Sequence, residues 1–180
     1  LHIYGFRKHR KIHEITAGLK EVTRHSIQWG KGESLHLGIA DVKHAFETMT
    51  FARAASAMEA VNIPAELRLA IVSCLIDNHG TVSFQDVTSE SIEWDTMIRT
   101  GGTEGPFLWN CQTVAMWEPV VSSWQEQSRG FQLEPSVTLY RRLTHAIWAD
   151  NVLIYASTKQ ELHYMMADFS KPLYLHGFSW

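Results

Sequence analysis

Two acidic residues stand where apolar strands are predicted to end, and each could contribute to a metal site. Asp150 lies between two apolar runs that read as the strands of a hairpin, residues 143–148 and 152–156. Asp41 follows directly after another apolar run, residues 35–40. A carboxylate in apolar surroundings is costly unless a positive group balances it. Two such carboxylates brought together at strand ends predict a divalent-metal site of the kind that supports phosphoryl transfer.

An ordinary hairpin turn is the simpler explanation for Asp150 taken alone. Asp and Asn both tolerate positive φ, so the pair Asp150-Asn151 suits a tight turn without any metal. The second acid, Asp41, is what favours the metal site. Histidine gives no comparable pattern: His9 and His13 stand four apart, but no third ligand accompanies them, which indicates solvated or nucleic-acid-facing side chains.

The remaining pattern predicts one α+β domain, with an antiparallel hairpin and helices packed behind it. The predicted helices cover residues 12–29, 51–61, 64–76, 107–127 and 158–169. The last of them begins with a capping box of Thr158 and Glu161, and a helical turn is expected at 42–49. The predicted strands cover residues 35–40, 81–87 paired with 91–98, 137–148 and 152–156. Four tryptophans fall at apolar positions and are expected in the core: Trp94, Trp117, Trp124 and Trp148.

Length and composition bound the class of protein. With 180 residues, 45% of them hydrophobic, the chain can bury a single core. Cys74 and Cys111 lie in apolar helical stretches, which predicts buried free thiols in a reducing, intracellular compartment. No apolar run reaches membrane-spanning length, and no signal peptide is visible. The chain begins with Leu rather than Met, so we expect it to be a fragment of a longer protein.

Charge is unevenly distributed along the chain, whose formal net charge is −3. Residues 1–31 hold seven Lys or Arg and two acids, whereas the remainder holds nine Lys or Arg and seventeen acids. The basic residues concentrate at 7–11, beside Tyr4 and Phe6. Basic side chains next to aromatic rings suit phosphates and stacked bases. A solvated start of a basic helix accounts for the same cluster equally well.

Four sequence blocks, taken in order, resemble those of reverse transcriptases, most closely the enzymes of non-LTR retrotransposons and group II introns. YGFRKHRKIHE at residues 4–14 resembles the fingers block G-F-R-x-G-R-S with its following acid. DVKHAFE at 41–47 resembles the first palm block, D-x-x-K-A-F-D. RTGGTEGPFL at 99–108 resembles R-G-x-P-Q-G-x-P-L-S-P, and IWADNVLIY at 147–155 resembles the metal-binding hairpin Y-A-D-D.

This resemblance implies a right-hand polymerase fold that consists of a palm and part of the fingers. Residues 1–34 would be a fingers segment, and residues 35–180 would be mainly palm with a fingers insertion. The blocks of the thumb, of an earlier part of the fingers and of an endonuclease are not found in the chain. The implied partners are an RNA template, a DNA primer and deoxynucleoside triphosphates, without a membrane; the oligomeric state stays open.

The resemblance also implies roles for particular residues in nucleotidyl transfer by two Mg²⁺ (or Mn²⁺) ions about 3.5–4 Å apart. Asp41 and Asp150 would be shared metal ligands, with the backbone carbonyl of Val42 completing one coordination sphere. Asn151 occupies the place of the second acid of the catalytic hairpin. Substrate would be bound by Phe46 beneath the incoming sugar, the loop residues Gly101, Gly102, Glu104 and Gly105, and the phosphate-binding Arg7 and Arg10. Core packing is the alternative explanation for Phe46.

Three departures from the family pattern bear on activity. Asn151 stands for an Asp, Glu104 for a Gln, and His9 for the middle Gly of the fingers block. Asn151 removes a negative charge beside the metals, and Glu104 adds one where the triphosphate is expected. The sequence therefore leaves open an active RNA-directed DNA polymerase, a catalytically inactive nucleic-acid-binding remnant of a retroelement, and a relic without a selected role. Another metal-dependent nuclease fits the order of blocks less well.

Overall fold

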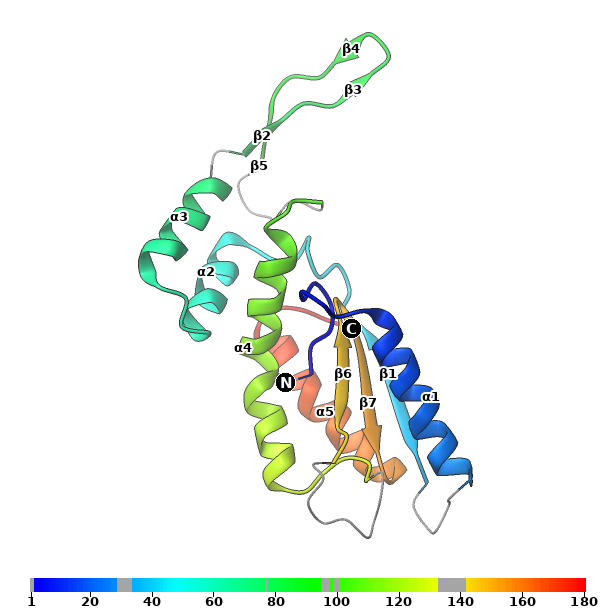
Figure 1. Ribbon diagram of the computed structural model, residues 1–180. Coiled ribbons are helices and arrows are strands. Elements are labelled where there is room, and N and C mark those ends of the chain that lie inside the picture. Colours follow the sequence, from blue (N-terminus) through cyan, green and yellow to red (C-terminus); the bar gives the residue numbers. More distant parts are fainter. Residues whose placement is uncertain (1, 29–33, 77, 95–97, 99–100, 133–141) are drawn as a thin grey trace. The chain divides into compact units, whose positions relative to one another are not determined.

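The computed structural model describes residues 2–28, 34–76, 78–94, 98, 101–132 and 142–180, and the chain divides into two compact units (Figure 1). The first unit comprises Leu1–Lys43 and Thr113–Trp180, and the second comprises His44–Gln112. Each unit contains helices together with antiparallel strands. This composition agrees with the predicted α+β class.

A three-stranded antiparallel sheet in the order β1-β7-β6 organises the first unit. Its strands are β1 (His36–Asp41), β6 (His145–Trp148) and β7 (Asn151–Ala156). The predicted hairpin is thus present as β6 and β7, joined by a turn at 149–150. The predicted strand at 137–148 is longer than the observed β6, and its residues 137–141 lie outside the described part of the chain.

Helices pack against both faces of this sheet. α1 (Ile12–Gln28) places Val22 in a buried cluster with Ala146 and Tyr155 of the sheet. On the opposite face, Leu162 and Met166 of α5 (Lys159–Leu175) lie against β1, as Figure 1 also shows for the helix behind the strands. Alternating strand residues point to opposite faces, and Ile154 on one face of β7 and Tyr155 on the other are both almost completely buried.

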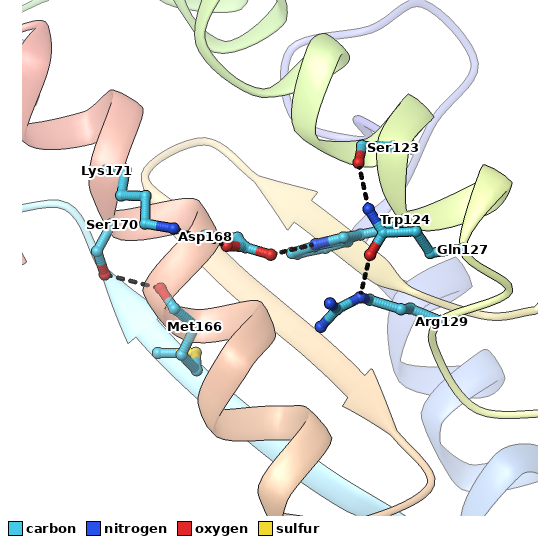
Figure 2. Close-up of polar contacts among 8 residues, drawn as sticks. All are labelled: Ser123, Trp124, Gln127, Arg129, Met166, Asp168, Ser170 and Lys171. Atoms are coloured by element: carbon cyan, nitrogen blue, oxygen red, sulfur yellow. Dashed lines mark hydrogen bonds and ion pairs between the residues drawn. The ribbon is translucent and has the colours of Figure 1, made fainter.

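The C-terminal half of α4 (Gly105–Glu126) packs on α5 through aromatic rings. Trp124 lies on Phe169, and its indole Nε1 donates a hydrogen bond to Oδ2 of Asp168 at 3.2 Å, while Lys171 pairs with the other oxygen of that carboxylate (Figure 2). Trp117 and Trp124 are 0% and 1% exposed, which confirms their predicted place in the core. Trp148 is only half-buried, and the side chain of Trp94 lies outside the described part of the structure.

The N-terminal segment adds to the free edge of β6. Ile3 forms a parallel bridge with Ile147, whose backbone exchanges hydrogen bonds with His2 and Tyr4 at 3.0 and 2.9 Å. The backbone N–H of His2 donates to Nε2 of His145 at 2.9 Å, so Nδ1 of His145 carries the ring proton, which it donates to the Thr144 hydroxyl at 2.8 Å. The two hydrogen bonds require a neutral imidazole.

We expect the stability of the fold to depend on pH through His145. Burial, reinforced by the neighbouring His2, lowers the pKa of His145 from 6.5 to about 3. The unfolded chain therefore takes up a proton between pH 6.5 and 3 that the folded chain does not, and stability is lost as pH falls through this window. The loss should reach about 2 kcal/mol by pH 5, measured as the urea-unfolding free energy.

The matched comparison is between two histidine variants. His145→Gln, which keeps an acceptor for His2, should flatten the dependence between pH 7 and pH 5. His163→Gln, at an exposed position on α5, should leave it unchanged. An unaltered slope in His145→Gln would show that other groups cause the loss.

The second unit contains two short helices, α2 (Phe51–Ala60) and α3 (Ala65–Leu75), which confirm the predicted pair. Thr50 caps α2 by accepting a hydrogen bond from the Arg53 N–H at 3.2 Å, and Pro64 precedes α3 as the sequence indicates. The predicted helical turn at 42–49 is instead a run of turns.

The strands of the second unit pair differently from the prediction. Asn78–Gly80, which lies outside the predicted strands, is strand β2 and pairs with β5 (Ile92–Trp94). In place of the predicted strand at 81–87 there is a small hairpin of β3 (Ser83–Phe84) and β4 (Val87–Thr88). Gln85 at its tip has φ +53, which suits a tight turn. The prediction was wrong because turn residues and strand residues alternate here at intervals too short to separate by pattern.

Other local predictions had mixed outcomes. Thr158 caps α5 and accepts from the Glu161 N–H at 3.0 Å, but the Glu161 carboxylate accepts from Ser157 and Gly130 rather than from Thr158. Cys111 is buried, and burial raises the pKa of its thiol. Cys74 is exposed, contrary to prediction, because α3 buries little of its surface: Leu75 is its one fully buried residue. Among the described helices, none is both long and apolar enough to span a membrane.

Candidate active site

The two predicted metal-binding acids lie at the same end of the sheet in the first unit. In the register of β1 and β7, Asp41 pairs directly with Asn151, and Asp150 occupies the turn immediately before it. The ladder continues one step further, because the backbone N–H of Val42 donates to the Asp150 carbonyl at 3.0 Å. The end of β1 is therefore fixed against the hairpin turn by backbone hydrogen bonds on both sides of Asp41.

The side chains at this end differ in exposure. Asp41 and Asn151 are exposed and, as directly opposed residues, share one face of the sheet. Asp150 is half-buried, and its Oδ1 accepts a hydrogen bond from Nδ2 of Asn151 at 3.2 Å. Val42 is 1% exposed, so its side chain anchors the strand end in the core while its backbone stays at the edge of the site.

The donor set of these residues fits Mg²⁺ or Mn²⁺ better than softer metals. It offers two carboxylates and a backbone carbonyl, all hard oxygen donors. The described residues contain no group of three or more His, Cys, Asp and Glu arranged to enclose a metal ion. Mg²⁺ does not require one, because it is commonly held by one or two carboxylates together with water and substrate phosphates.

The hairpin turn that carries Asp150 is supported from the N-terminal segment. Ala149 has φ +55, an uncommon conformation for a residue with a side chain. Gly5 lies directly on this turn: a Cβ at Gly5 would be 3.2 Å from Cα of Ala149 and even closer to its backbone nitrogen. Glycine is therefore required at residue 5 by the close approach of two backbones.

We expect Gly5→Ala to destabilise the fold and to displace the turn that holds Asp150. The added methyl meets backbone atoms, which cannot rotate away as a side chain could, so a loss of about 1–3 kcal/mol is expected. Urea unfolding measures the loss. Gly18→Ala, in α1 with open space around its Cα, is the control and should be neutral or stabilising. Equal stability of Gly5→Ala and wild type would contradict the contact.

The basic segment has both predicted arginines at the surface. Arg7 and Arg10 are exposed; Arg10 pairs with Glu14 at 2.8 Å, which raises the pKa of its guanidinium, and lies 5.4 Å from the centre of the Tyr4 ring. Between them the chain turns tightly, with φ +63 at His9. A positive φ at this residue gives a physical reason for the Gly that the fingers block has in its place.

The other predicted substrate-binding residues lie in the second unit. Phe46 packs at 6.0 Å from the ring of the fully buried Trp109 and contacts the start of α4 at Gly105. Gly101 has φ +88, and the Glu104 side chain folds over Gly102. Core packing therefore accounts for at least part of the role of Phe46. Residues 99–100 of the glycine loop lie outside the described part of the chain.

Two residues near the acids were not predicted from the sequence to belong to the site. Trp148 pairs with Asn151 across the hairpin, so Trp148, Asn151 and Asp41 form a row over three strands. Gly5 supports the turn, as described above. Both belong to the sequence blocks already quoted, but a block does not reveal which of its residues make contacts between distant segments.

The first unit thus combines an antiparallel sheet, two acids near one end of it, and helices on both of its faces. The sequence profile of the family described as "Reverse transcriptase (RNA-dependent DNA polymerase)" matches residues 2–179. The chain therefore belongs to the reverse transcriptase family. No curated protein matches the chain.

Proposed function

We propose that this chain is the catalytic domain, by descent, of an RNA-directed DNA polymerase of the non-LTR retrotransposon or group II intron type. The family match supports the general activity. The observation that carries the proposal is the pairing of Asp41 with Asn151, with Asp150 adjacent and bonded to Val42 through the backbone. Two acids near one end of a sheet, one on β1 and one in the β6–β7 turn, suit metal-assisted phosphoryl transfer.

Asp41 and Asp150 would hold the divalent ions, with the Val42 carbonyl as a further ligand. When bound, Mg²⁺ would lower the pKa of the primer 3′-hydroxyl and neutralise charge on the triphosphate. The hydrogen-bonded ladder around Asp41 fixes the backbone positions from which the two carboxylates extend, which limits the reorganisation needed during the reaction. Arg7 and Arg10 would bind phosphates of the template or the nucleotide.

The residues of the second unit would contact the incoming deoxynucleoside triphosphate. Phe46 would lie beneath its sugar and disfavour a 2′-hydroxyl, and the loop with Gly101, Gly102 and Gly105 would let the backbone approach the base pair. Glu104 opposes this binding through its negative charge. Together with Asn151, it lowers the expected activity of the natural sequence.

Primer extension on an RNA template tests the proposal. We expect slow, Mg²⁺- or Mn²⁺-dependent incorporation by the chain, and a loss of about 100-fold or more in Asp41→Asn, since this variant removes a charged metal ligand. Asp86→Asn, an exposed acid in the second unit, is the matched control and should retain full activity. Extension that persists in Asp41→Asn would exclude the assigned site.

A second candidate function is nucleic-acid binding without catalysis. Its support is the exposed run of basic residues at 7–11, which lies beside the Tyr4 ring in the first unit. Binding of RNA that weakens with rising salt and needs no divalent metal, without extension, would favour this function. Absence of salt-dependent binding would exclude it.

A further inference from the structure

We propose that Asn151 is a positioning residue that competes with the divalent cation for the carboxylate of Asp150. The amide would thereby weaken metal binding beyond the simple loss of one charge. This inference rests on the proposed function, because it assumes that Asp150 is a metal ligand. It concerns a residue that differs from the acid of the family pattern.

The supporting geometry is the 3.2 Å hydrogen bond from Nδ2 of Asn151 to Oδ1 of Asp150. The direction of the bond is fixed chemically: an ionised carboxylate only accepts, so the NH₂ group and not the amide oxygen must face it. The amide oxygen of Asn151 is therefore directed away from this contact. Asn151 acts here as a donor to a ligand and not as a ligand in its own right.

The electrostatic surroundings give this bond weight. In the described part of the chain, no Lys, Arg or His forms an ion pair with Asp41 or Asp150, and the Asn151 amide is the one side chain that donates to Asp150. A cation that binds Oδ1 has to displace or share that donor. An Asp at residue 151 would reverse the effect, because it would repel the Asp150 carboxylate and favour a bridging cation.

Direct binding of Mn²⁺ alone, followed by the electron paramagnetic resonance signal of free Mn²⁺, tests the inference on the complete chain. Removal of the donor in Asn151→Ala should tighten Mn²⁺ binding about two- to tenfold, the range that one net hydrogen bond gives. Asn151→Asp should tighten it more, and Asp150→Asn should abolish it. Asp86→Asn should leave binding at the wild-type value.

The outcomes separate the inference from the proposed function. If Asn151→Asp binds Mn²⁺ but Asn151→Ala binds it no more tightly than wild type, the inference is overturned while the metal site stands. Weaker binding in Asn151→Ala would mean that the amide oxygen is itself a ligand. If no variant binds Mn²⁺ at millimolar concentrations, the inference and the two-metal proposal both fail. Circular dichroism confirms that each variant is folded, and Asn151 is exposed, so truncation leaves no buried cavity.

Discussion

The double variant Asn151→Asp with Glu104→Gln should extend a primer about a hundredfold faster than the natural sequence, or more. Asn151→Asp adds a unit of negative charge at a residue that pairs directly with Asp41 and adjoins Asp150. At about 4 Å and an intermediate dielectric, the added carboxylate would interact with a bound metal ion by roughly 4 kcal/mol per unit charge. This energy corresponds to a factor of about a thousand in rate. Side-chain mobility and solvent reduce this upper figure.

The second substitution acts separately from the first. Glu104→Gln removes a carboxylate from the glycine loop that is expected to face a triphosphate, so it should lower KM more than it raises kcat. Asn151→Asp should mainly raise kcat, because charge beside the metals matters most in the transition state. Steady-state kinetics of the two single variants and the double variant distinguish these effects.

Matched controls connect any gain to the candidate site. Asn62→Asp makes the same chemical change at an exposed residue of the second unit and should not alter extension. Asp41→Asn in the repaired background should abolish the gain. A folded double variant that extends no primer would show that the site cannot be restored by charge alone, and it would favour the nucleic-acid-binding alternative.

The sequence predicted the elements that carry a strong period and a clear boundary. α1, α2, α3, α4 and α5 all occur within a few residues of their predicted starts, since each has either an apolar stripe, a capping residue or a proline at its beginning. α5 extends beyond the prediction to Leu175, with Pro172 inside its last turn. Helix ends differ more from the prediction than helix starts do, because helix termination depends on tertiary contacts as well as on local residues.

Pairing between distant segments could not be predicted from the local pattern. The sequence indicated that Asp41 and Asp150 both end apolar strands, but nothing local shows that β1 lies beside β7 or that Asp41 faces Asn151. A shift of one residue in this register would send Asp41 to the other face of the sheet. The same holds for the contact of Gly5 with Ala149, which joins two sequence blocks far apart in the chain.

The roles of individual site residues stay predictions of the family resemblance. The family match covers the chain but does not assign metal ligands or a template. For Phe46, the contacts with Trp109 and Gly105 provide a structural reason for an aromatic residue that is independent of the nucleotide. Kinetic discrimination between deoxynucleotides and ribonucleotides by Phe46→Val would separate the two roles, since a pure packing defect should slow both substrates equally.

Trp117→Ala should cause the largest loss of stability among single substitutions in the first unit, about 3–5 kcal/mol. The side chain is 0% exposed and stacks on Phe169, with ring centres 4.8 Å apart and planes 9° from parallel. The centre of the Trp180 ring is 6.2 Å away, and Nε1 of Trp117 donates to the Phe169 carbonyl at 3.1 Å. Truncation would therefore leave a cavity, remove two ring contacts and expose a buried carbonyl without its donor.

Urea unfolding followed by circular dichroism measures this loss, and two further variants locate its cause. Trp117→Phe keeps a ring for stacking but lacks the indole N–H. It should therefore lose less stability than Trp117→Ala, and the difference between the two losses measures the contribution of the cavity. Tyr174→Ala removes a ring from the same unit at an exposed position of α5 and should cost little. Phe169 also contacts Trp124 of α4 and His145 of β6, the strand that leads into the Asp150 turn. A large loss in Trp117→Ala would therefore support aromatic packing as the main connection between α4, α5 and this strand. A loss no greater than that of Tyr174→Ala would contradict this packing.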